Sequence, residues 1–130
     1  MAENGGREAG LKARQEVLGP EYVRRAQENA DEFTQEFQDY LNEHCWGTVW
    51  TRDGLERRTR SLVTISVLAT SSRWNEFTTH VRGALRNGCT PEEIREVLMH
   101  LAVYAGVPTS VEAFRNAQPV IADWKQAAGG

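Results

Sequence analysis

Glu76 and His80 are the two residues whose types and spacing most directly suggest chemistry. They are four positions apart in a segment with helical periodicity, so their side chains share one face and can exchange a hydrogen bond. A histidine held by a carboxylate has a fixed tautomer and can act as an acid, a base or a donor to an oxyanion. The same spacing also occurs in ordinary surface pairs worth ~0.2–0.5 kcal/mol of helix stability, so the pattern alone supports either interpretation.

Arg57 and Arg60 form a second candidate pair, three positions apart at the predicted start of another helix. On one helix face, two guanidinium groups can clamp a carboxylate in a bidentate arrangement. Residues 51–90 hold seven arginines against three acidic residues, although the whole chain has a net charge of −3. This basic middle segment indicates a site for a small anion. Alternatively, Arg57 and Arg60 belong to a solvated first turn of the helix or form ion pairs at an interface.

Aromatic residues could complete such a site. Trp46 and Trp50 occupy a glycine-bearing connector over residues 45–54, where they could keep water away from a ring-shaped substrate. Tryptophans in such places are also common as anchors of a core or of a subunit interface. Tyr104 could supply a hydroxyl donor, although it falls on the apolar stripe of the helix expected over 91–104, which favours packing in the core.

The other histidines and the cysteines do not suggest a metal centre. His44 ends a predicted helix, where a cation favours the helix dipole, and His100 lies off the apolar stripe of its helix. Because the spacings typical of metal ligands are missing, a site combining His44, His80 and His100 with carboxylates is a remote possibility. We expect no metal, and we expect Cys45 and Cys89 to be inert thiols.

The elements that must position these residues are helices. Apolar residues recur with helical spacing nearly everywhere, and no stretch alternates with a period of two. The sequence therefore predicts one all-α domain of about six helices over residues 1–130, with residues 1–6 and 126–130 frayed. Helical segments are expected over residues 7–18, 20–29, 31–44, 55–71, 74–87, 91–104 and 108–127. Asn87-Gly88 is a helix-ending signal, and Thr90 with Glu93 matches a capping box that begins the next helix.

Composition excludes several classes of function. The 130 residues are 40% hydrophobic and 25% charged, which is typical of one soluble globular domain. The sequence has no apolar run near the ~20 residues that a membrane helix needs, and its N-terminus lacks the apolar segment of a signal peptide. The negative net charge argues against nucleic acid as a partner. Two cysteines outside any disulfide-like or metal-like pattern indicate the reducing cytoplasm.

Five short blocks carry a resemblance to a known family. They are HCWGTVWTRDGL at residues 44–55, RRTRSL at 57–62, EFTTH at 76–80, NG at 87–88 and YAGVP at 104–108. In this order the blocks resemble the 4-carboxymuconolactone decarboxylases over nearly the whole chain. The resemblance implies a helical, alkylhydroperoxidase-D-like fold assembled as a homo-trimer or homo-hexamer.

Many members of the wider superfamily carry a Cys-x-x-Cys-x-x-x-His redox motif. His80 matches its histidine, whereas Arg73 and Glu76 occupy the two cysteine positions. This departure excludes the dithiol peroxidase reaction, which needs a pair of thiols that can form a thiolate.

The resemblance implies decarboxylation of 4-carboxymuconolactone to 3-oxoadipate enol-lactone and CO2, a step of the beta-ketoadipate pathway of aromatic catabolism. The substrate is an unsaturated lactone whose own carbonyl accepts the electrons left by CO2, so no cofactor is needed. The resemblance also favours a catalytic role for His80 and Glu76. It implies that the substrate-binding residues are Arg57, Arg60, Trp46, Trp50 and Tyr104. Two alternatives stay open: a lyase or isomerase of the same scaffold acting on another anionic lactone or enone, and a non-enzymatic helical assembly or binding protein. Arginines held in ion pairs would favour the latter.

Overall fold

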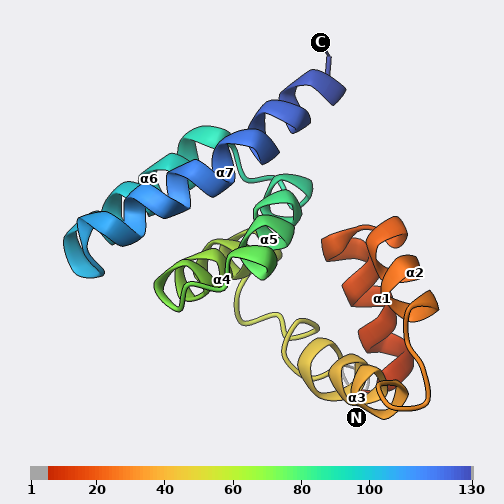
Figure 1. Ribbon diagram of the computed structural model, residues 1–130. Coiled ribbons are helices and arrows are strands. Elements are labelled where there is room, and N and C mark those ends of the chain that lie inside the picture. Colours follow the sequence, from red (N-terminus) through yellow and green to blue (C-terminus); the bar gives the residue numbers. More distant parts are fainter. Residues whose placement is uncertain (1–5, 130) are drawn as a thin grey trace. The chain divides into compact units, whose positions relative to one another are not determined.

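The computed structural model describes residues 6–129, and every regular element in that part of the chain is helical (Figure 1). The all-α fold class is therefore confirmed, with seven α-helices and one π-helical segment between residues 6 and 129. Of the ends expected to fray, residues 1–5 and 130 lie outside the described residues, and helical backbone continues through Ala127. The chain divides into two compact units, with the boundary between Arg57 and Arg58.

The first unit contains α1 (Arg7–Leu18), α2 (Pro20–Glu28), α3 (Gln35–Tyr40) and the π-helical segment η1 (Leu41–Trp46). The helix expected over residues 31–44 begins later, because the Asp31 carboxylate accepts hydrogen bonds from the backbone N–H groups of Phe33 and Thr34 and holds them in a turn. It also ends later, since η1 carries helical backbone through Trp46.

Close packing of α1 against η1 shapes this unit. A β-carbon on Gly10 would lie 1.6 Å from the carbonyl oxygen of Asn42, so a residue without a side chain is needed there. Nearby, the buried Arg14 donates from Nη1 to Gln38 Oε1 and to Asn42 Oδ1, both at 3.0 Å. The hydrophobic core of the first unit consists of Ala13, Val17, Leu18, Val23, Trp46 and Trp50.

The second unit follows with α4 (Arg57–Thr70), α5 (Trp74–Arg86), α6 (Pro91–Tyr104) and α7 (Val107–Ala127). Figure 1 shows α6 and α7 running side by side in opposite directions, joined by a short turn. Gly88 has φ 98° and follows the end of α5, as the sequence predicts. The capping box also forms: Thr90 accepts from the Glu93 N–H, and the Glu93 carboxylate accepts from the Thr90 N–H.

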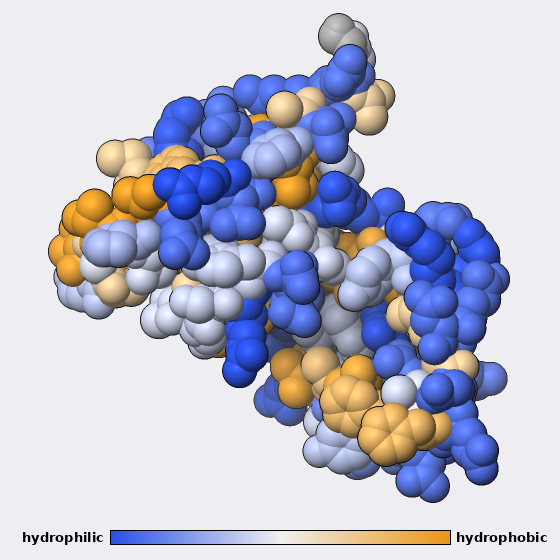
Figure 2. Space-filling model, in the orientation of Figure 1, coloured by the Kyte–Doolittle hydropathy of each residue, from blue (hydrophilic) through white to orange (hydrophobic). Residues whose placement is uncertain are grey.

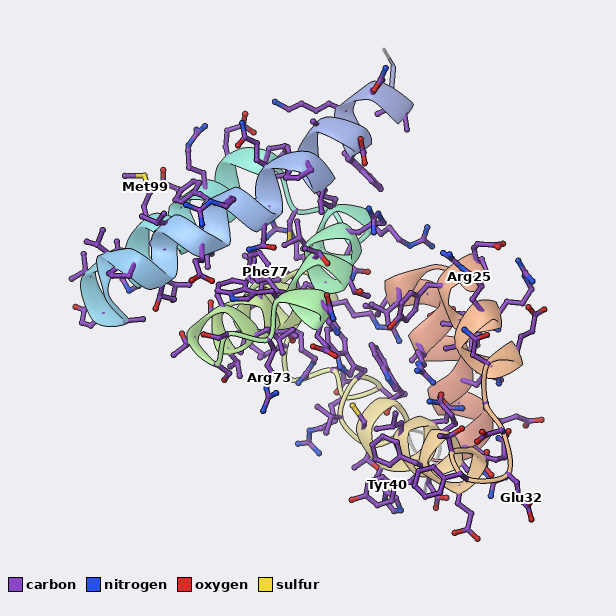
Figure 3. All side chains as sticks on the ribbon, viewed as in Figure 1. Arg25, Glu32, Tyr40, Arg73, Phe77 and Met99 are labelled. Atoms are coloured by element: carbon purple, nitrogen blue, oxygen red, sulfur yellow. The ribbon has the colours of Figure 1, made fainter. Side chains whose placement is uncertain are left out.

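The core of the second unit draws on all four of its helices. Figure 3 shows Phe77 enclosed by these helices, whereas Met99 points away from them. Helix α4 buries one face through Ile65 and Ala69 and leaves Val63 and Val67 exposed. The buried apolar side chains are Ile65, Ala69, Phe77, Val81, Ala84, Leu85, Cys89, Ile94, Leu98, Leu101, Ala113, Ala117 and Val120.

None of the helices between residues 6 and 129 is both long enough and apolar enough to cross a membrane.

Candidate active site

His80 lies on α5, one turn after Glu76 and next to the buried Val81. Its side chain is half-buried, whereas Glu76 is exposed. Burial lowers the pKa of His80 to about 4, and the carboxylate of Glu76 opposes this effect by stabilising the protonated ring. The imidazole is therefore neutral at neutral pH.

A neutral imidazole narrows the chemistry open to His80. It carries one N–H donor and one nitrogen acceptor, so it can donate a hydrogen bond to a developing oxyanion or accept a proton. It is a poor general acid at neutral pH, because a group with a pKa of about 4 is almost entirely deprotonated there. Among the three roles expected of His80, the structure therefore favours oxyanion donor or base.

Arg57 and Arg60 both lie in the first turn of α4. Arg57 donates from Nη1 to Glu16 Oε1 at 2.6 Å, within the first unit, and its side chain is one-third exposed. A substrate carboxylate would have to compete with Glu16 for this guanidinium. The side chain of Arg60 is half-buried.

The two tryptophans belong to the core of the first unit. Trp46 and Trp50 are each 5% exposed, and their ring centroids are 5.0 Å apart with the planes tilted by 23°. This stacked pair is packed with Val17 and Val23. Their structural role is therefore that of core anchors, the alternative that the sequence left open.

Tyr104 is 79% exposed, so the expectation that it packs in the core is wrong. It is the last residue of α6, where the chain turns toward α7, and its ring lies against that of His100 with centroids 5.0 Å apart. The apolar stripe of α6 stops being covered before this turn. The Tyr104 hydroxyl is therefore placed at a surface.

Three of the seven candidate residues, Trp46, Trp50 and Arg57, belong to the first unit. The other four belong to the second unit. The carboxylate of Glu76 raises the pKa of His80 against the effect of burial, which is an interaction between two of the polar candidates.

Arg58 and Glu93 form an ion pair that the sequence did not predict. The sequence suggests that Glu93 belongs to a solvated face, but it binds Arg58 and also caps α6, and both contacts lower its pKa. The capping box was visible in the sequence. The pairing was not, because it depends on how the start of α4 lies against the start of α6.

Both thiols are poorly suited to nucleophilic chemistry. Burial raises the pKa of Cys45 and of Cys89, which lowers the fraction of reactive thiolate at neutral pH. Cys89 Sγ also donates to the carbonyl oxygen of Arg58 at 3.3 Å. Among residues 6–129, no group of three or more His, Cys, Asp and Glu side chains is arranged to hold a metal ion.

Comparison with known proteins places this chain among decarboxylases. The sequence profile of the carboxymuconolactone decarboxylase family matches residues 35–119. A 4-carboxymuconolactone decarboxylase of Acinetobacter baylyi is 45% identical over 114 residues, which cover 88% of this chain and 85% of the relative. A nitrosuccinic acid decarboxylase of Metarhizium robertsii is 46% identical over 114 residues, covering 88% of this chain and 80% of the relative.

Both relatives are named as decarboxylases, that is, as carboxy-lyases. The family match spans α3 through most of α7 and includes Glu76 and His80. The chain therefore belongs to the carboxymuconolactone decarboxylase family.

Proposed function

We propose that this decarboxylase converts 4-carboxymuconolactone into 3-oxoadipate enol-lactone and CO2, a step in the catabolism of protocatechuate. The observation that carries the proposal is the neutral imidazole of His80 beside Glu76 on a helix within the family match. The 45% identity to a relative of that name supports the choice of substrate.

The reaction needs an acceptor for one electron pair and a donor of one proton. When the bond to CO2 breaks, its electrons form a ring double bond and push the existing double bond toward the lactone carbonyl, which becomes an enolate oxygen. A proton, which we propose comes from water, then adds to the carbon next to that carbonyl. Because the substrate supplies its own electron sink, we propose that no cofactor takes part.

His80 and Glu76 are the proposed catalytic residues. The N–H group of a neutral imidazole can donate to the enolate oxygen as its charge develops, which is the moment when such a hydrogen bond is strongest. Glu76 would act through His80, because its carboxylate stabilises the protonated ring and so raises its basicity. The low pKa of His80 disfavours a cationic imidazole as the proton source at neutral pH.

The remaining candidates have proposed roles in substrate binding. Arg57 and Arg60 would bind substrate carboxylates, Trp46 and Trp50 would exclude water from the ring, and Tyr104 would supply a hydroxyl donor. Because Arg57 is paired with Glu16, a substrate carboxylate would have to displace Glu16 from this guanidinium.

Nitrosuccinate is a second candidate substrate, because the relative named nitrosuccinic acid decarboxylase is 46% identical to this chain. The two molecules share a chemical core: each is a succinate unit with an electron acceptor attached to the carbon that loses CO2. In one the acceptor is a conjugated lactone carbonyl, and in the other it is a nitro group that becomes a nitronate. A hydrogen-bond donor at the acceptor oxygen, the role proposed for His80, serves both reactions.

The test is a direct comparison of the two substrates. The purified chain is given 4-carboxymuconolactone or nitrosuccinate, and CO2 release is measured together with the ultraviolet absorbance of the lactone. We expect a higher kcat/KM for the lactone, and loss of turnover in His80→Ala. Preference for nitrosuccinate would select the second candidate. Release of CO2 from neither substrate would overturn the assignment and favour another anionic lactone or enone, or a non-enzymatic role in assembly or binding.

We also propose a cytoplasmic homo-oligomer, a trimer or a hexamer. Two free thiols, Cys45 and Cys89, support a reducing compartment. Exposed apolar side chains on α3, α6 and α7 support assembly with further copies.

A further inference from the structure

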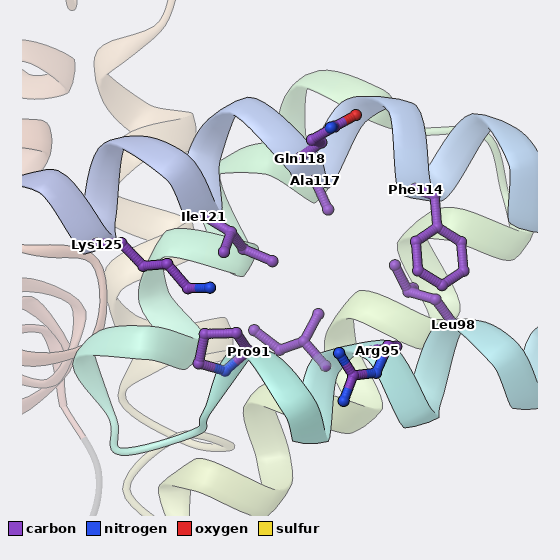
Figure 4. A pocket seen from close by; sticks show the side chains of 9 residues that line it. Pro91, Arg95, Leu98, Phe114, Ala117, Gln118, Ile121 and Lys125 are labelled. Carbon is purple, nitrogen blue, oxygen red and sulfur yellow. The ribbon is translucent and has the colours of Figure 1, made fainter.

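A cavity of about 370 Å³ lies between α6 and α7 in the second unit (Figure 4). This volume falls within the range of sites that hold small molecules. None of the seven residues proposed for catalysis or substrate binding lines it. The cavity is therefore a separate feature that decarboxylation does not explain.

The floor of the cavity is apolar. Ile94 and Leu98 from α6 and Ala117 from α7 line it, and all three belong to the buried core of the second unit. The ring of Phe114 lines one end and is partly exposed. The apolar surface open to a ligand is that of Phe114 and of the partly buried Pro91 and Ile121, and covering it with a hydrocarbon body removes apolar area from water.

Two cations line the same cavity from opposite helices. Arg95 comes from α6, and Figure 4 shows Lys125 extending from α7 toward Pro91. No acidic residue lines the cavity. Within residues 6–129, neither cation forms an ion pair or a side-chain hydrogen bond, although Glu92 and Glu96 are near Arg95 in sequence.

We propose that this cavity binds a small amphipathic carboxylate, such as an aromatic or cyclic monocarboxylic acid, at a site separate from the catalytic residues. The carboxylate lies against Arg95 and Lys125, and the ring covers the accessible parts of Phe114 and Ile121. Arg95 and Lys125 are both exposed, so a carboxylate can reach them, whereas a neutral ligand would gain no contact between opposite charges and a small polar anion would leave the apolar surface unused. The combination of floor and rim selects a ligand with one charged end and an apolar body.

Benzoate is a suitable probe of this site. The full chain, with its isoleucine and leucine methyl groups labelled, is titrated with benzoate, and binding is measured by calorimetry and by NMR. We expect one benzoate per chain, with the largest shifts at the methyl groups of Ile94, Leu98 and Ile121. Benzamide, which lacks the charge, and acetate, which lacks the ring, should bind more weakly.

A double variant tests the two cations. Arg95→Gln with Lys125→Gln should weaken benzoate binding by about tenfold or more, because each removes a charge-assisted contact. The matched control is Arg115→Gln, an exposed arginine of α7 that does not line the cavity. His80→Ala should bind benzoate as the unaltered chain does, so this test is independent of the proposed decarboxylation.

Three results would overturn the proposal. The first is benzoate affinity that the double variant leaves unchanged, and the second is equal affinity for benzamide. The third is methyl shifts that follow protein concentration instead of benzoate, which would show that another copy of the chain covers the cavity.

Discussion

The state of one imidazole shapes the proposed chemistry at the scale of single residues. His80 has a pKa of about 4 because burial outweighs the carboxylate of Glu76. Enzymes shift such values by placing a titratable group between a desolvating core and one charged neighbour. α5 does this with two residues one turn apart, of which one is half-buried and the other exposed.

His80→Ala should lower kcat much more than it raises KM. The hydrogen bond to the enolate oxygen is realised mainly in the transition state, so its loss affects turnover. Groups of this kind contribute ~10²–10⁴-fold, and the loss should fall in that range. Steady-state kinetics on 4-carboxymuconolactone measure it, with His44→Ala, at an exposed histidine outside the candidate residues, as the control. Near-native turnover in a folded His80→Ala protein would remove His80 from the mechanism.

Glu76→Gln should lower the pKa of His80 below its value of about 4. The carboxylate stabilises the protonated ring and so raises this pKa, and its neutral replacement removes that opposition to the effect of burial. An NMR titration of the histidine ring protons, with His44 and His100 as internal references, measures the shift. An unchanged or higher pKa in the variant would show that Glu76 does not act on His80.

The same pKa gives a direction for stability. The unfolded chain takes up a proton on His80 near pH 6.5, while the folded chain resists protonation until about pH 4. The free energy of unfolding should therefore fall as the pH is lowered from about 6.5 to about 4, because over this interval the unfolded chain binds a proton that the folded chain does not.

The elements that hold these residues depend on local signals of different strength. Thr90 caps α6 through its hydroxyl, and Glu93 accepts from the Thr90 N–H while also binding Arg58. These contacts lower the pKa of Glu93, so what they contribute is lost as pH falls through that pKa. The start of α6 is therefore held in two ways. The capping box is encoded in four consecutive residues, whereas the pair of Arg58 and Glu93 joins residues 35 positions apart in the sequence.

Thr90→Ala should reduce the free energy of unfolding by about 1 kcal/mol, because the N–H of Glu93 loses its acceptor. Thr90→Ser keeps the hydroxyl and should retain most of the stability. Urea unfolding followed by helical circular dichroism compares the two variants. Equal losses in both would mean that the threonine methyl group, and not the cap, matters at this position.

Gly10→Ala should destabilise the first unit even though alanine favours helices. The new β-carbon would lie 1.6 Å from the carbonyl oxygen of Asn42, and this backbone contact can be relieved only by moving α1 away from η1. Overpacking of this kind typically costs ~1–3 kcal/mol. Tryptophan fluorescence during urea unfolding reports it through Trp46 and Trp50. Gly54→Ala, whose β-carbon would meet nothing within 4 Å, is the matched control.

Much of the fold follows from the sequence, because helices are encoded locally. The bounds of α6 match the segment expected over residues 91–104, since Thr90, Pro91 and Glu93 mark its start. The sequence did not predict the π-helical segment, which lies where α1 approaches the backbone of Asn42, a contact between residues far apart in the chain.

For the candidate site, the spacing of Glu76 and His80 predicted their interaction, but not the depth to which His80 is buried. The pairing of Arg57 with Glu16 joins residues 41 positions apart and has no local signal. The same is true of the contact between Arg58 and Glu93.

At the scale of the whole molecule, both units expose large apolar side chains. Phe33, Phe37 and Tyr40 are exposed on and before α3, with Phe33 at 91%. Figure 2 shows apolar side chains gathered at the turn between α6 and α7, where Val103 and Val107 are exposed. Contiguous surfaces of this kind mark sites of protein association.

We therefore predict a homo-oligomer in which another chain covers the turn between α6 and α7. Sedimentation at micromolar concentration should give a mass well above the 14.6 kDa of one chain, at the value for a trimer or a hexamer. Val103→Asp should lower that mass, because a carboxylate at an exposed valine must be desolvated when an apolar interface closes over it. Arg115→Gln, an exposed substitution on α7 that adds no charge to an apolar surface, should leave the mass unchanged. A mass of one chain for the unaltered protein would contradict assembly itself, whereas an oligomer that tolerates Val103→Asp would place the interface elsewhere.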